Sequence, residues 1–199
     1  MRHYYYEHTT DIVSSTINKA ESGVRYSLRF FITGKGVKTM EEAMKKIFSA
    51  GFDIRKNVKI GNMKMDYTAF RFDQQGRTLA ISKKAIDTYT THENVYVFHK
   101  TMHAETYRHE MDGILQNIYP TLKLEKDHYE TLIDLIILTP LDQKLEGMIR
   151  SYQKTKLLKL GFGGAITSRI IAIDRKRNKV TGHKAVKQLQ SKLEGVLMK

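Results

Sequence analysis

The last quarter of the chain, residues 144–199, combines a large excess of positive charge with the apolar spacing of folded elements. It holds 14 Lys+Arg and three Asp+Glu, whereas the first 143 residues hold 20 and 18, so +11 of the net charge of +13 falls here. Apolar residues recur at strand spacing in Ile166–Ile173 and at helical spacing in Leu189–Leu197. The pattern predicts a segment tied into the core that displays its charge on a fixed face. Such an excess is typical of a protein that meets a polyanion or lies beside one.

Length and composition predict one folded domain. We expect a single domain over residues 1–199, with a near-neutral α/β body (1–143) and a basic helix–strand–helix portion (144–199) packed on it. Cysteine is absent, which excludes disulfides, thiolate zinc sites and cysteine nucleophiles. No stretch approaches 18 uninterrupted apolar residues, and Met1–Glu7 lacks the apolar core of a signal peptide. We therefore expect a cytoplasmic protein with no membrane partner.

Local patterns predict the elements of the first half. Thr39-Met40-Glu41-Glu42 is a capping box, and the helix behind it ends at Gly51. Gln74-Gln75-Gly76 between two strand-like runs predicts a hairpin, with Thr68, Phe70 and Phe72 on one face. The other predicted elements are strands at 4–6, 25–33 and 94–99, a hairpin with strands at 64–73 and 77–82, and helices at 9–20, 82–89 and 104–119.

The second half contains one ambiguous run. Residues 131–138, Thr-Leu-Ile-Asp-Leu-Ile-Ile-Leu, fit a buried strand or a helix capped by Asp127, and we favour the helix. A further helix is predicted from Pro140 to the glycines at 161–164, then a strand at 166–173, a basic turn at 174–178 and a last helix opened by Thr181. The fold class predicted is α+β, with mixed antiparallel sheet elements, several amphipathic helices and a basic helical C-terminal quarter.

Motifs for phosphate and metal chemistry are weak. Residues 33–39, Thr-Gly-Lys-Gly-Val-Lys-Thr, lack the glycine and Lys-Ser/Thr spacing of a phosphate loop. The glycines at 161–164 precede a β-branched strand, so they predict a turn. Four histidines fall within 18 residues (His92, His99, His103 and His109), but no metal-ligand spacing links them. We expect no metal, no cofactor and no small-molecule substrate.

One catalytic alternative stays open. His8-Thr9-Thr10 and His99-Lys100-Thr101 are two His-x-Thr triplets, and His and Thr two residues apart on a strand point to the same face. In these six positions the chain resembles the two-histidine phosphoesterases, which implies His8, Thr10, His99 and Thr101 as acid, base and phosphate ligands. Lys100 and Glu7 depart from the apolar surroundings usual in that family. Because the chain has no nucleophile elbow and no carboxylate constellation, a non-enzymatic protein is the favoured interpretation.

The basic quarter supplies the candidate site. We predict that the following residues lie next to nucleic acid: Arg169, Arg175, Lys176, Arg177, Lys179, Lys184 and Lys187. Contacts of lysine and arginine with phosphates give affinity and salt sensitivity and do not read sequence. Aromatic residues do not interleave with these bases, which disfavours a stacking platform in this segment. The alternative interpretation is a solvated face that only keeps the protein in solution.

As a whole the chain resembles the small sigma-factor-binding proteins of Twort-like staphylococcal phages. The resemblance lies in the length, the start Arg2-His3-Tyr4-Tyr5-Tyr6, the absence of Cys and Trp, the lysine-rich helices and the lack of a catalytic motif. It implies binding to region 4 of the host primary sigma factor on RNA polymerase, and inhibition of host transcription at promoter DNA. The near-neutral body would dock on sigma, and the basic quarter would lie along DNA. An independent, sequence-nonspecific DNA- or RNA-binding protein is the alternative.

Overall fold

The computed structural model describes residues 39–78, 85–159 and 163–198. The chain divides into two compact units, residues 1–32 and 33–199, and every described residue belongs to the second. The elements predicted at 4–6, 9–20 and 25–33, together with His8 and Thr10, lie outside the described residues.

The described residues form an α+β fold around a seven-stranded mixed sheet, which confirms the predicted class. In chain order the elements are α1 (Met40–Phe48), β1 (Asp53–Ile60), β2 (Met63–Thr78), β3 (Ala85–His99), α2 (Tyr107–Ile118), η1 (Tyr119–Thr121), β4 (His128–Leu138), α3 (Gln143–Ser151), β5 (Gln153–Leu157), β6 (Ala165–Asp174), β7 (Lys179–Gly182), η3 (Lys184–Val186) and α4 (Lys187–Leu197). The strand order is β1-β2-β3-β4-β6-β5, and β7 also pairs with β6. The β3·β4 and β4·β6 pairs are parallel, and the others are antiparallel.

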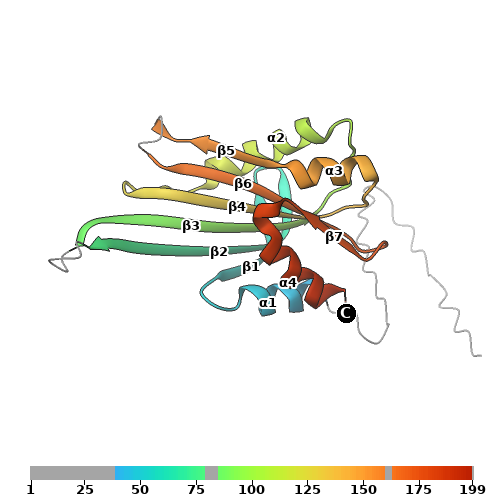
Figure 1. Ribbon diagram of the computed structural model, residues 1–199, viewed down its shortest axis with the longest axis horizontal. Helices are drawn as coiled ribbons and strands as arrows, with labels where there is room; N and C mark the ends of the chain where they lie inside the picture. The colour runs from blue at the N-terminus through green and yellow to red at the C-terminus, as the bar shows by residue number, and fades with distance from the viewer. Residues whose placement is uncertain (1–38, 79–84, 160–162, 199) are drawn as a thin grey trace, which may run out of the picture. The chain divides into compact units, whose positions relative to one another are not determined.

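Each face of the sheet is covered by its own pair of helices (Figure 1). On one face, called here the α2 face, helices α2 and α3 pack on Tyr96, Phe98 and Ile133. On the other, the α4 face, helices α1 and α4 pack on Val95, Val97 and Ile136. Successive side chains of the central strands point to opposite faces and so contribute to two separate apolar cores, as in a layered domain with helices on both sides of a sheet.

Helix α1 forms as the sequence predicts. Thr39 Oγ1 accepts a hydrogen bond from the Glu42 amide at 3.2 Å, and Glu42 Oε2 accepts one from the Thr39 amide at 3.0 Å. Both halves of the capping box are therefore present. Met40, Ala43, Met44 and Phe48 are buried against the α4 face, so cap and apolar stripe agree.

The favoured helix at 131–138 is wrong, because these residues belong to strand β4. The strand lies between two parallel neighbours, β3 and β6, and its residues 133–138 are all buried. A strand covered on both faces is apolar at every position and so loses the alternation that identifies a strand. The alternative of a buried strand is the one confirmed.

The predicted hairpin turn at Gln74–Gly76 is also wrong. Strand β2 runs through these residues, and β3 pairs with them in register, Gln74 with Thr90 and Gly76 with Thr88. The same pairing places residues 85–89 in β3, where a helix was predicted. Long-range pairing supplies the backbone hydrogen bonds that a local turn would have made. The outer halves of β2 and β3 therefore run side by side past the helices (Figure 1).

Three boundaries differ in the last third. Helix α3 begins after Pro140, where Asp142 Oδ1 accepts from the Leu145 amide at 2.7 Å, and it ends at Ser151. Strand β5 then pairs with β6 at residues where the helix was predicted to continue. Thr181 belongs to β7, and the last helix starts only at Lys187. Strand β6 and the basic turn at 174–178 are confirmed.

No helix of the described residues is long and apolar enough to cross a membrane.

Candidate nucleic-acid interface

The seven cations predicted to lie near nucleic acid occupy three different places. Arg169 lies within β6, in the interior of the sheet. Residues 175–179 form the β6–β7 turn and the start of β7. Lys184 and Lys187 belong to η3 and the first turn of α4. The structure therefore does not gather all seven on one face, and their partners distinguish them.

Arg169 forms an ion pair with the buried carboxylate of Asp134. Its Nε and Nη2 donate to the two carboxylate oxygens of Asp134, each at 2.7 Å, across the β4·β6 pair. The Asp134 side chain is 1% exposed and that of Arg169 is 16% exposed. Burial raises the pKa of Asp134, and the guanidinium counteracts that shift. Arg169 thus neutralises an internal charge.

Arg177 and Lys179 also have internal partners. Arg177 donates from Nη1 to the Leu141 carbonyl and from its amide to Asp174 Oδ1, while the other Asp174 oxygen accepts from the Leu141 amide at 2.9 Å. Lys179 Nζ lies 2.6 Å from Glu146 Oε2. This hydrogen bond to Lys179 is the main reason why the pKa of Glu146 is lowered. These two cations fasten the β6–β7 turn to α3 and to the segment that precedes it.

Five cations of the β6–β7 turn, η3 and α4 are exposed, and their side chains make no hydrogen bond or ion pair within the described part of the chain. They are Arg175, Lys176, Lys184, Lys187 and Lys192, and we call them the free-cation set. Arg175 is exposed, but neighbouring atoms partly exclude water from its guanidinium and lower its pKa. An arginine nevertheless stays protonated in a protein. The acids nearest in sequence are engaged, Asp174 at the turn and Glu194 with Gln190. The positive charge of the free-cation set is therefore available to solvent or to a ligand.

The α4 face also carries a row of charged side chains that sequence reasoning missed. Arg71 on β2 donates to Glu93 on β3 at 2.8 Å, and Asp134 and Arg169 continue the row on β4 and β6. Burial raises the pKa of Glu93, and the charge of Asp134 adds to that shift. One signal was available: Asp134 is the single charged residue of an apolar run, and a buried charge requires a partner.

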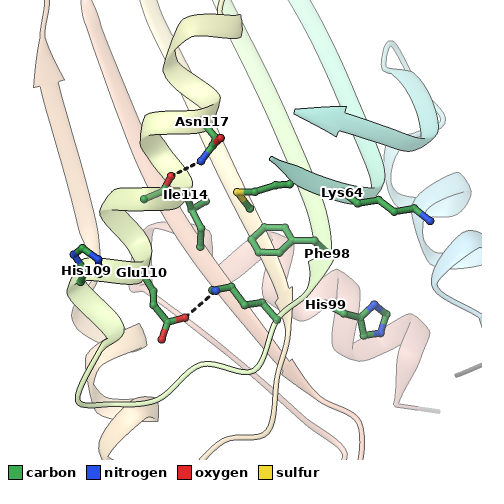
Figure 2. A pocket seen from close by; sticks show the side chains of 10 residues that line it. Lys64, Phe98, His99, His109, Glu110, Ile114 and Asn117 are labelled. Atoms are coloured by element: carbon green, nitrogen blue, oxygen red, sulfur yellow. Dashed lines mark hydrogen bonds and ion pairs between the residues drawn. The ribbon is translucent and has the colours of Figure 1, made fainter. Parts of the chain in front are cut away.

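A cavity of about 390 Å³ lies between the end of β3, one side of helix α2 and the start of β2. Its apolar floor includes Phe98 and Ile114, and its rim carries Lys64, His99 and His109 (Figure 2). Glu110 in this cavity is ion-paired with Lys100 at 3.1 Å, and His99 Nδ1 lies 2.8 Å from Asp66 Oδ2. The His8 half of the phosphoesterase alternative lies outside the described residues, so that alternative stays untested. No group of three His, Cys, Asp or Glu residues in the described ranges could hold a metal ion.

Comparisons with known proteins identify a family whose function is unknown. No curated protein and no solved structure matches the chain. A family model matches residues 37–195, which is most of the chain and includes every described helix and strand apart from the end of α4. The chain therefore belongs to the family described as a domain of unknown function, DUF8052.

Proposed function

We propose that this protein is a non-enzymatic binding protein that contacts the phosphate backbone of nucleic acid through its free-cation set. The observation that supports the proposal is the division of the cations in the last quarter. Arg169, Arg177 and Lys179 are engaged by internal partners, whereas the five residues of the free-cation set are exposed and unpaired within the described residues. An excess of unpaired positive charge on ordered elements attracts a polyanion and holds it in a fixed position.

The spacing of the lysines at the start of α4 fits this role. Lys187, Gln188, Ser191 and Lys192 are exposed on one side of α4, while Leu193, Val196 and Leu197 are buried on the other. Lys184 lies three residues before Lys187, in η3. Gln188 and Lys192 are four residues apart and share a side of α4, while Lys184 and Lys187 lie at its N-terminal end, so the three lysines can contact phosphates along one backbone. Contacts of this kind fix the position of a duplex without reading its bases.

The partner protein is the more specific part of the proposal. The sequence resemblance implies the primary sigma factor of a bacterial host, with inhibition of transcription at promoter DNA and a place in the host cytoplasm. Binding of purified sigma region 4 to the protein, in the presence of nuclease, tests this part. Retention only on bare nucleic acid would favour the independent, sequence-nonspecific binder instead. Phosphodiester hydrolysis that is abolished by His99→Ala would favour the phosphoesterase alternative.

Removing the charge of three free lysines is expected to reduce the salt dependence of duplex binding. In Lys184→Gln/Lys187→Gln/Lys192→Gln, the slope of log K against log salt should fall by about 0.9 for each phosphate that the protein no longer neutralises, so by up to about 3. Titration of a labelled duplex at several salt concentrations measures the slope. The matched control is Lys45→Gln/Lys144→Gln/Lys154→Gln, which removes the same charge from lysines already paired with Glu41, Glu105 and Asp112.

The control separates a site from net charge. If the free lysines contact phosphates, the control keeps most of the wild-type slope, because its cations are neutralised in the folded protein. Equal reductions of the slope in the two triple variants would mean that only the total charge matters, and the proposed contact surface would then be wrong.

A further inference from the structure

A second surface combines exposed aromatic rings with buried polar groups. Phe70 and Phe72 are alternate residues of β2 on the α2 face, and they are 39% and 44% exposed. Their cross-strand partners on β3 are Asn94 and His92. The helices of this face cover the neighbouring Tyr96 and Phe98 instead. We call Phe70 and Phe72 the aromatic patch.

His92 lies at the centre of this patch. The centroid of its ring is 5.7 Å from that of Phe70, 5.3 Å from that of Phe72 and 5.8 Å from that of His128. Its Nε2 is 2.7 Å from Glu125 Oε2, so the imidazole is paired with this carboxylate. Burial lowers the pKa of His92, so the imidazole is neutral at pH 7. The two phenylalanine rings thus lie against a neutral, polar floor.

Two polar side chains close to His92 on the same strand have no hydrogen-bond partner in the described structure. Thr90 Oγ1 and Asn94 Nδ2 lie on β3 two positions to either side of His92 and on the same face, and neither buried atom has a hydrogen-bond partner in the described structure. Thr90 is 1% exposed and His92 is 4% exposed. Buried polar atoms in a folded protein are nearly always paired, so these two atoms leave hydrogen-bonding capacity next to the exposed rings. Asn94, which is half-buried beside Phe70, offers a donor to an acceptor placed there.

The charge around the patch selects the type of ligand. Lys123 and Lys126 flank Glu125 in the segment between η1 and β4, and both are exposed with no carboxylate partner among the described residues. A ligand that stacks on aromatic rings, accepts hydrogen bonds and carries negative charge satisfies all three features. Unstacked bases of single-stranded nucleic acid have these properties, because each base has a π-face, polar edges and a phosphate.

We infer that the aromatic patch binds bases of single-stranded nucleic acid, with Phe70 and Phe72 as stacking surfaces. The inference rests on the proposed function and adds to it a second contact, on the face of the sheet opposite to α4. The free-cation set holds phosphates of either form of nucleic acid, and the aromatic patch engages only bases that are free of a duplex. The protein therefore distinguishes melted from paired strands.

Two labelled probes test the aromatic patch, an oligothymidylate of about 12 nucleotides and a duplex of equal length. Phe70→Ala/Phe72→Ala is expected to weaken binding of the single strand by roughly tenfold for each ring and to leave duplex binding unchanged. Phe70→Leu/Phe72→Leu, which keeps apolar bulk without an aromatic face, should lose single-strand binding in the same way. Leu157→Ala removes a 64% exposed apolar side chain elsewhere and should change neither probe. Thermal unfolding of each variant confirms that it folds.

Each alternative outcome has its own meaning. If the wild-type protein binds neither probe, the proposed function is wrong and the inference falls with it. If the wild type binds both probes and the alanine variant does the same, only the inference is wrong. If the leucine variant binds the single strand as tightly as the wild type does, the contact is apolar docking without stacking, and the inference is wrong. A lower sedimentation mass for the alanine variant than for the wild type would show a contact between two copies of the chain, and would also overturn it.

Discussion

Replacing Arg169 by methionine is expected to lower the free energy of unfolding by about 3–5 kcal/mol at pH 7, because it leaves a buried carboxylate without its partner. Asp134 receives two hydrogen bonds from Arg169, and its side chain is 1% exposed. Urea unfolding followed by circular dichroism measures the loss. The double variant Asp134→Leu/Arg169→Met removes both charges and should recover most of the stability.

The loss should also depend on pH. Burial already raises the pKa of Asp134 in the folded protein, and removing Arg169 raises it further. A carboxyl whose folded pKa exceeds its unfolded value of about 3.9 binds more protons when folded, so its contribution to stability falls as pH rises above that value. The single variant should therefore approach the wild type near pH 4 and diverge from it towards pH 7. A loss under about 1 kcal/mol at pH 7, or a double variant as unstable as the single one, would contradict the described pair.

Gly164→Ala is expected to destabilise the protein by about 3 kcal/mol. Gly164 has φ +81°, and a Cβ added there would lie 2.3 Å from the Tyr129 carbonyl oxygen and 2.7 Å from His128 Nδ1. The neighbouring contacts are fixed as well: His128 Nδ1 lies 2.9 Å from the Gly163 carbonyl oxygen, and Gly164 accepts from the Leu158 amide at 2.9 Å. These two hydrogen bonds oppose a shift of Gly163 and Gly164 away from an added methyl group.

Gly147→Ala is the matched control for this change. Gly147 lies within α3, and a Cβ added there meets no atom within 4 Å. Alanine in a helix is favoured over glycine by about 0.5–1 kcal/mol, so this variant should be slightly more stable than the wild type. Equal stabilities of the two variants in urea would show that the backbone at Gly164 is not constrained as described.

Predictions from local signals succeeded where local chemistry decides the structure. The start of α1 follows from Thr39 and Glu42, which satisfy each other's backbone amides within one turn. The basic turn at 174–178 follows a strand whose β-branched residues identify it. Neither feature depends on residues far away in the sequence.

Predictions failed where a distant strand decides. Residues 131–138 are apolar at nearly every position because β4 lies between β3 and β6 and is covered on both faces, and such a run does not show whether it is a strand or a helix. The turn signal at Gln74–Gly76 gave way to pairing with β3 for the same reason. In both cases the missing information was the identity of the partner strand.

The candidate site was likewise predicted in part, where local sequence was sufficient, and missed where distant residues decide. The charge count located the cations, but their availability depends on strand register: Asp134 lies 35 residues before Arg169, and Glu146 lies 33 residues before Lys179. The sequence placed Phe70 and Phe72 on one face of a strand, and the alternation in β2 confirms this. It could not show that the helices leave those two rings exposed, because helix positions follow from packing of the whole sheet.

The most direct test of the proposed contact surface is lysine modification, with mass spectrometry of the protein alone and with bound duplex. The proposed surface predicts that an amine-reactive reagent modifies Lys176, Lys184, Lys187 and Lys192 less when the duplex is bound, and that high salt restores their reactivity. Lys144 and Lys154, paired with Glu105 and Asp112, should react equally in both states. Unchanged reactivity of the four free lysines while the duplex is demonstrably bound would contradict the proposal.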